Sequence, residues 1–246
     1  TMNEIEINAA EQPWSKAEKV YVGLCSFFVV VLVLTNIVGV KLFIVPWMDD
    51  GNGNPITLTT GIVTYPLTFL ITDTVSEIYG RKRADFMVWL GFALSMVMLV
   101  VVAVYVGLPG SEVWINKDLG YSTVPEMQRA FESVFTLPGT LVLGSMSAYL
   151  CAQLLDNRLF HFWKGVTNGK HLWLRNNGST ILSQLVDTIV VNSIFLGWGM
   201  SVPWPVVWQI IWAVYICKII LALVDTPLVY LAVAGIRHYL NHETKK

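Results

Sequence analysis

The sequence has few charged residues and few cysteines, and each scarcity excludes a class of protein. Only 13% of its 246 residues are charged and 54% are hydrophobic, whereas soluble domains carry about 25% charged residues. The formal net charge of −1 gives no reason to expect a nucleic-acid partner. Cys25, Cys151 and Cys217 are too widely spaced for a zinc motif or a disulfide framework. We therefore expect an integral membrane protein with buried free thiols and no metal or cofactor.

Long apolar runs account for most of the chain. A helix that crosses about 30 Å of hydrocarbon needs about 20 apolar residues. Six runs meet that requirement, at about 20–45, 57–79, 86–107, 135–155, 179–199 and 206–236. The sequence therefore predicts an all-α protein with six transmembrane helices in one domain over residues 19–237. Tails at 1–18 and 238–246 flank this domain.

Lysine and arginine are distributed unevenly among the connections between these runs. One side of the predicted membrane holds Lys16, Lys19, Arg81, Lys82, Arg83, Arg158, Lys164, Lys170, Arg175, Arg237, Lys245 and Lys246. The other side holds Lys117 and Arg129. Because cytoplasmic loops carry an excess of lysine and arginine, we expect both termini to be cytoplasmic.

Two shorter patterns concern the connections and the packing. The segment "VPEMQRAFESVF" spaces Met127, Phe131 and Phe135 as a helix does, which predicts a short interfacial helix or an ordered loop. The fourth run has small residues at Gly144, Ala148 and Ala152. Small residues four apart allow two helix backbones to approach closely, so we expect close packing there.

Five ionisable residues lie inside the predicted spans, where lipid disfavours them: Asp73, Glu77, Asp187, Lys218 and Asp225. Each ionised side chain near the bilayer centre costs about 2.5–3.5 kcal/mol, so five unpaired ones would cost about 12–17 kcal/mol. With a helical rise of about 1.5 Å per residue, their positions along the helices place them at similar depths, in one layer between the membrane midplane and the cytoplasmic side. They are therefore expected to face one another, water or a ligand.

Two interpretations of this layer stay open. In the first, salt bridges only hold the helices together, with Lys218 neutralising Asp225 or Asp187 and Arg81 neutralising Glu77. In the second, the carboxylates outnumber the intramembrane base and form a pocket for a ligand that carries N–H donors or positive charge. The unequal count favours the second interpretation.

Three separated motifs connect these residues to a known family. "DTVSEIYGRKRAD", "KHLWLRNNGSTILSQLVDT" and "LVDTPLVYL", in this order, resemble the queuosine precursor transporter family, six-span vitamin-uptake-like proteins of bacteria. The resemblance implies an inner-membrane importer of 7-cyano-7-deazaguanine or its aminomethyl relative. It also implies a fold similar to the substrate-binding component of energy-coupling-factor vitamin transporters.

The predicted substrate-binding residues are Asn36, Asp73, Glu77, Gln184, Asp187, Lys218 and Asp225. A carboxylate can accept the N1–H and the exocyclic amine of a guanine-like edge, and an amide can serve its carbonyl. We expect Lys218 and Asp225 to form a charge pair that gates or completes the site. The expected partners are the base, the lipid bilayer and, through the uncharged third run, a second copy of the chain.

The positions of the histidines bear on a different class of function, intramembrane proteolysis. An intramembrane serine protease needs a histidine inside the membrane, but His161, His171, His238 and His242 fall in connections or in the tail. The chain is therefore not expected to be an enzyme. The main alternative is a substrate-binding subunit of an energy-coupling-factor-type vitamin or nucleobase transporter, which needs a separate ATPase module.

Overall fold

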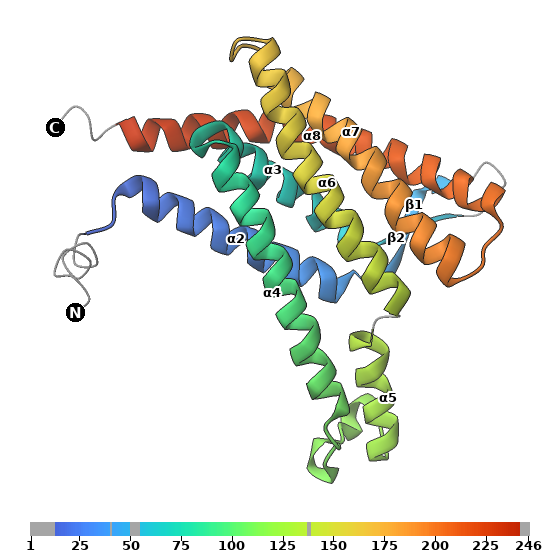
Figure 1. Cartoon of the computed structure of the whole chain (residues 1–246). Coiled ribbons are helices and arrows are strands. Elements are labelled where there is room, and N and C mark those ends of the chain that lie inside the picture. The colour runs from blue at the N-terminus through green and yellow to red at the C-terminus, as the bar shows by residue number, and fades with distance from the viewer. Residues whose placement is uncertain (1–12, 40, 50–54, 137–138, 242–246) are drawn as a thin grey trace, which may run out of the picture.

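The computed structural model describes residues 13–39, 41–49, 55–136 and 139–241 (Figure 1). Parts of both predicted tails, residues 1–12 and 242–246, lie outside the described residues. The long elements are α2 (Lys16–Val38), β1 (Leu42–Asp49), β2 (Pro55–Thr59), α3 (Gly61–Tyr79), α4 (Arg81–Gly107), α5 (Val124–Phe135), α6 (Gly139–Val166), α7 (Leu172–Asn192) and α8 (Trp204–Asn241). Two 3₁₀ turns (Glu112–Trp114 and Lys117–Leu119) precede α5, and a π-helix (Ser193–Gly199) extends α7.

Long helices occupy all six predicted positions, but they differ in composition. Within the described ranges, four are long and apolar enough to cross a membrane, namely α2, α4, α8 and α7 with its π-helical extension. The other two, α3 and α6, carry polar residues that face each other. Thr72 bonds Gln153 at 3.3 Å and Ser76 bonds Asn157 at 3.2 Å. These two helices thus satisfy their polar side chains inside the bundle instead of exposing them.

A β-hairpin corrects the predicted limits of the first two spans. β1 and β2 pair antiparallel, so residues 42–45 belong to a strand and not to the first helix. Residues 57–59 likewise belong to the second strand and precede α3. Residues 42–45 are as apolar as a span, but the β-branched and aromatic residues of this region flank a segment rich in Asn and Gly. That composition favours a hairpin over a helix. Apart from this hairpin the described elements are helical, so the predicted all-α fold class is confirmed.

Local sequence features fix several helix ends. Ser15 and Glu18 form a capping box at the start of α2, with N–H···O distances of 3.2 and 2.8 Å. Gly80 separates α3 from α4 at φ 84°, a conformation that favours glycine. Thr123 and Glu126 form a second capping box that opens α5, and backbone N–H donors lower the pKa of Glu126 below its usual value. Of the two alternatives for this segment, a short helix or an ordered loop, the structure has the helix.

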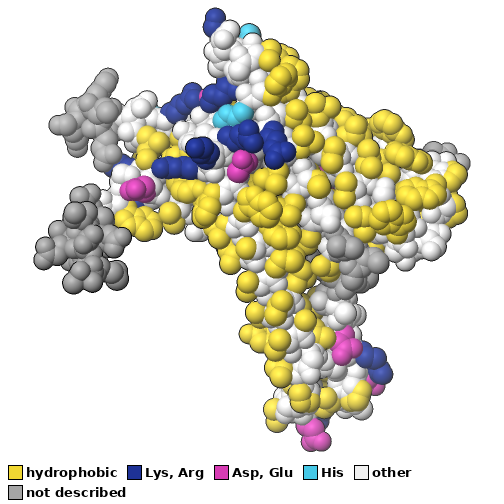
Figure 2. Space-filling model, in the orientation of Figure 1, with side chains coloured by type: hydrophobic (Ala, Val, Ile, Leu, Met, Phe, Trp, Pro, Cys, Tyr) yellow, Lys and Arg dark blue, Asp and Glu magenta, His cyan; other side chains and the backbone are white. Residues whose placement is uncertain are grey.

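The helices form a bundle with one projecting arm. In Figure 1, α6 and α7 run side by side, while the far half of α4 leaves the bundle together with α5. The start of α2 and the end of α8 both lie on the left of the view. In Figure 2, lysine and arginine side chains gather toward that end, whereas acidic side chains mark the tip of the arm.

Apolar side chains lie both in the core and on the outer surface. The core cluster joins α2, α3, α4 and α6 through residues such as Phe28, Leu32, Val75, Met87 and Tyr149. Large exposed hydrophobic side chains cover α4 and α8, for example Val97, Val100, Val104, Leu223, Val224 and Leu231. Many buried side chains are instead polar or charged. A polar interior inside an apolar surface is the arrangement expected of a protein in lipid.

The small residues of α6 lie in close contacts. Ala148 and Ala152 are buried. A Cβ added at Gly144 would lie 3.3 Å from the backbone oxygen of Val191 in α7. The predicted close packing along this helix is confirmed.

Candidate functional site

One face of α3 carries most of the site. Tyr65, Phe69, Asp73 and Glu77 are spaced four residues apart, so they line up along one side of the helix over about 18 Å. All four are buried or half-buried. Charged groups from α6, α7 and α8 meet this face at three successive depths.

The first cluster surrounds Asp187 of α7. The Tyr65 hydroxyl donates to Asp187 Oδ1 at 2.8 Å, and Lys218 Nζ donates to Asp187 Oδ2. The ammonium also lies 5.0 Å from the centre of the Tyr65 ring, within cation–π range. The Lys218 and Asp187 side chains are only 13% and 7% exposed. Asp187 is therefore a buried, fully paired carboxylate that joins α3, α7 and α8.

This pairing corrects the expected ion pair between Lys218 and Asp225. Among the described residues, Lys218 forms its ion pair with Asp187. Lys218 and Asp225 are seven residues apart on α8, which separates them by about 10 Å along the helix axis. Asp187 reaches the ammonium from the neighbouring helix at the same depth, so it is the closer partner.

A small cavity lies beside this pair. It is lined by Ile62, Tyr65, Pro66, Phe69, Thr180, Gln184, Lys218, Leu221, Ala222 and Asp225. Its volume is about 20 Å³, which is room for a water molecule but far below the roughly 300 Å³ of small-molecule sites. Gln184 Oε1 is buried and has no donor in the described part of the chain. The cavity thus combines two aromatic rings, an unpaired amide oxygen and a carboxylate.

The second cluster is a pair of carboxyl groups, Asp73 of α3 and Asp156 of α6. They are 1% and 0% exposed and lie within hydrogen-bonding reach of each other. Ser183 donates to Asp156 Oδ1 at 2.9 Å, while Asp73 Oδ1 and Asp156 Oδ2 have no donor within the described ranges. Ionised carboxylates only accept hydrogen bonds. A hydrogen bond between these two groups therefore needs a proton on one of them.

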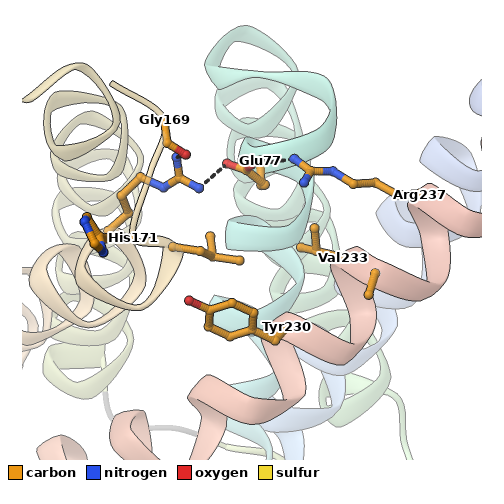
Figure 3. Close-up of a pocket in the computed structure, with 9 residues that line it drawn as sticks. Glu77, Gly169, His171, Tyr230, Val233 and Arg237 are labelled. Atoms are coloured by element: carbon orange, nitrogen blue, oxygen red, sulfur yellow. Dashed lines mark hydrogen bonds and ion pairs between the residues drawn. The ribbon is translucent and has the colours of Figure 1, made fainter. Parts of the chain in front are cut away.

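The third cluster is centred on Glu77, near the end of α3. Lys164 Nζ and Arg175 Nη2 lie 2.9 and 3.0 Å from Glu77 Oε2, and Arg237 Nη2 lies 2.6 Å from Oε1. Figure 3 shows the Glu77 carboxylate between guanidinium groups that approach from two sides. The suggested partner Arg81 pairs instead within its own helix, α4.

The predicted site residues thus lie at several depths in the bundle and not in one layer. Three of the predicted residues line the small cavity, namely Gln184, Lys218 and Asp225. Asp187 lies beside them. Asp73 and Glu77 lie about one and two helical turns beyond Phe69, the last residue of α3 that lines the cavity. Asn36 is in the last turn of α2, where its Nδ2 is buried without an acceptor among the described residues. Each four-residue step moves a side chain by about 6 Å, so the residues of α3 cannot share one depth.

The residues that sequence reasoning did not assign to the site include Tyr65, Phe69, Asp156, Lys164, Arg175 and Arg237. The four-residue spacing with Asp73 could have indicated both aromatic residues. Asp156 was missed because the fourth run was ended at 155, whereas α6 continues to Val166. Arg175 was counted as a loop cation, but it lies in the first turn of α7 and is 2% exposed.

Comparison with known proteins supplies the context for this geometry. Residues 59–232 match the family described as "Putative vitamin uptake transporter". The chain belongs to this family. The matched range covers α3 to most of α8, so it includes every residue of the three clusters except Arg237. Membership in this family supports a multi-pass membrane protein that acts in transport.

A curated relative agrees with the family match. A "Probable queuosine precursor transporter" of Bacillus subtilis (strain 168) is 32% identical over 180 residues, which is 72% of each chain. The resemblance drawn from the three sequence motifs is therefore confirmed. No solved structure matches the chain at a significant level, so the similarity to energy-coupling-factor components stays a prediction.

Proposed function

We propose that this protein imports queuosine precursor bases, 7-cyano-7-deazaguanine and its aminomethyl relative, across the bacterial inner membrane. One observation carries the proposal: aromatic, amide and carboxylate side chains from α3, α7 and α8 converge on one cavity. The relative described as a "Probable queuosine precursor transporter" supports the choice of substrate.

The proposed topology has six spans and two cytoplasmic termini. Four long apolar helices would face lipid and shield α3 and α6, whose polar residues face inward. The apolar outer surface of α4 would accommodate lipid or a second copy of the chain. Energy-coupling-factor-like assembly with an ATPase module remains the alternative.

Asp225 is the residue that we assign to the base edge. It lines the cavity and forms no ion pair with another described residue, whereas Asp187 already accepts from Tyr65 and Lys218. A free carboxylate can accept both the N1–H and the exocyclic amine of the base. Gln184 supplies an amide beside it.

The aromatic residues of α3 suit a flat ligand. The Tyr65 and Phe69 rings contact each other edge to face, with centroids 5.4 Å apart. Flat bases bind well against such rings. A base inserted along this face would lie over one ring while its polar edge meets α7 and α8.

The cavity must enlarge to admit a base, and each lining helix has an irregularity that permits this. Pro66 lies within α3 and Pro227 within α8, and each removes a helical hydrogen bond. The π-helix at Ser193–Gly199 follows α7, and such segments often accompany functional sites. We infer that bending at these places separates α3, α7 and α8.

Direct binding tests the substrate assignment. Purified protein in mild detergent should bind 7-cyano-7-deazaguanine, measured by calorimetric titration. Asp225→Asn should weaken binding about tenfold or more, because hydrogen bonds to a charged group contribute about 1.5–3 kcal/mol. Asp118→Asn, an exposed carboxylate outside the bundle, is the matched control. Absence of binding to the unaltered protein would reject the proposal, and equal binding by Asp225→Asn would reject the role of that residue.

The carboxyl pair Asp73 and Asp156 is where we place any coupling to protons. A carboxyl pair inside the bundle can take up a proton from one side of the membrane and release it on the other side during the transport cycle. If so, uptake of labelled base into liposomes should rise with an inward proton gradient, and Asp156→Asn should abolish that rise. Uptake by the reconstituted chain that ignores the gradient would exclude proton coupling. Absence of uptake without an ATPase module, with base binding intact, would favour the alternative subunit function.

A further inference from the structure

The charges around Glu77 do not balance. One carboxylate faces three basic side chains, Lys164, Arg175 and Arg237, which leaves two positive charges without a counter-charge in the cluster. Arg175 is 2% exposed, and its Nε is buried with no acceptor in the described part of the chain. Burying a donor without an acceptor is costly. The cluster is therefore short of negative charge and of hydrogen-bond acceptors.

A cavity of about 330 Å³ opens beside these charges. Figure 3 shows that Glu77, Arg237, Tyr230 and His171 surround it, from α3, α8 and the start of α7. Arg175 is part of the same lining. This volume lies within the range of small-molecule sites, and no lining residue except Glu77 is acidic.

A further donor and the start of a helix lie at the wall of the cavity. The Tyr230 oxygen accepts a hydrogen bond from the backbone N–H of Trp173 at 3.0 Å, so its own hydrogen can donate to a ligand. His171 directly precedes α7, whose first turn has no side-chain cap and no acidic residue. The positive end of the helix dipole favours an anion at such a position.

We propose that this cavity binds a phosphate group, either from an anionic lipid headgroup or from a soluble phosphate compound. Arginine guanidinium groups and a tyrosine hydroxyl are the donors that phosphate oxygens prefer. Inorganic phosphate or a phosphate monoester can supply up to two negative charges, whereas a lipid phosphodiester supplies one, and each offers several acceptor oxygens to these donors. The site shares no residue with the cavity assigned to the base, so it is a second binding site.

Titration of inorganic phosphate tests the site directly. The full chain in nanodiscs of phosphatidylcholine should bind phosphate in calorimetry at constant ionic strength. Arg237→Gln and Tyr230→Phe should each weaken binding about tenfold, since each removes a hydrogen bond to a charged group. Arg158→Gln, an exposed arginine of α6 outside the cavity, should bind like the unaltered protein. Arg175 is left intact because its guanidinium is buried between Glu77 and the Gly169 carbonyl, so its loss would disturb the fold.

A second set of nanodiscs distinguishes the two sources of phosphate. If a lipid headgroup is the ligand, phosphatidylglycerol in the discs should compete and suppress the binding of inorganic phosphate. If a soluble compound is the ligand, phosphatidylglycerol should leave that binding unchanged. No phosphate binding in phosphatidylcholine discs, or equal affinities for the unaltered protein, Arg237→Gln and Tyr230→Phe, would overturn the proposal. The base titration in the same samples should be unaffected by both variants, so the two proposals can fail separately.

Discussion

At the residue scale, Asp187 is a buried carboxylate whose two oxygens are both paired, one with Tyr65 and one with Lys218. Asp187→Asn would leave the Lys218 ammonium, 13% exposed, without its carboxylate. Removing one partner of a buried ion pair costs about 3–5 kcal/mol. We therefore expect a clear fall in the thermal unfolding midpoint of the detergent-solubilised protein.

The double variant Asp187→Asn with Lys218→Gln provides the matched comparison. It removes both charges together, so no ammonium is left unpaired, and it should recover much of the lost stability. The exposed variant Asp118→Asn should leave the midpoint unchanged. If Asp187→Asn is as stable as the unaltered protein, the ion pair does not contribute to folding.

The limits of sequence reasoning are also visible at single residues. The unequal count of acids and bases suggested free carboxylates, but Arg175 and Lys164 were assigned to a loop. Hydropathy finds the 20 or so residues that fill the hydrocarbon, whereas α6 and α7 extend beyond those runs. Their extra turns bring Lys164 and Arg175 to Glu77, and no spacing rule within one helix could identify partners on three others.

At the element scale, Gly91 of α4 sets how closely α2 and α6 can approach. A Cβ at this position would lie 2.7 Å from Phe28 Cε1 and 2.9 Å from the Tyr149 hydroxyl, and both side chains are buried. Gly91→Ala should therefore destabilise the protein by about 1–3 kcal/mol through overpacking, measured as a lower unfolding midpoint.

A glycine with open surroundings is the control for this prediction. A Cβ at Gly23 of α2 would meet no atom within 4 Å, so Gly23→Ala should be neutral or stabilising by up to about 1 kcal/mol through helix propensity. If both variants have the same effect, close packing at Gly91 is not the cause.

The elements themselves were largely predictable because apolar runs and helix caps are local properties. All six long helices and α5 occur where the sequence places them. The hairpin was not predicted, since hydropathy alone does not separate a helix from a strand in residues 42–45. The depth of Asp73 and Glu77 relative to α7 and α8 depends on how the helices slide past each other, which no single segment encodes.

At the scale of the whole molecule, positive charge gathers at one end of the bundle (Figure 2), and the bias of lysine and arginine toward the cytoplasm predicts that this end is inside. Lys170→Cys, between α6 and α7, and Leu119→Cys, in the arm, are both exposed positions. With Cys25, Cys151 and Cys217 replaced by alanine, an impermeant thiol reagent should label Leu119→Cys in intact spheroplasts. It should label Lys170→Cys only after permeabilisation. The opposite pattern would invert the topology and place the proposed phosphate cavity outside the cell.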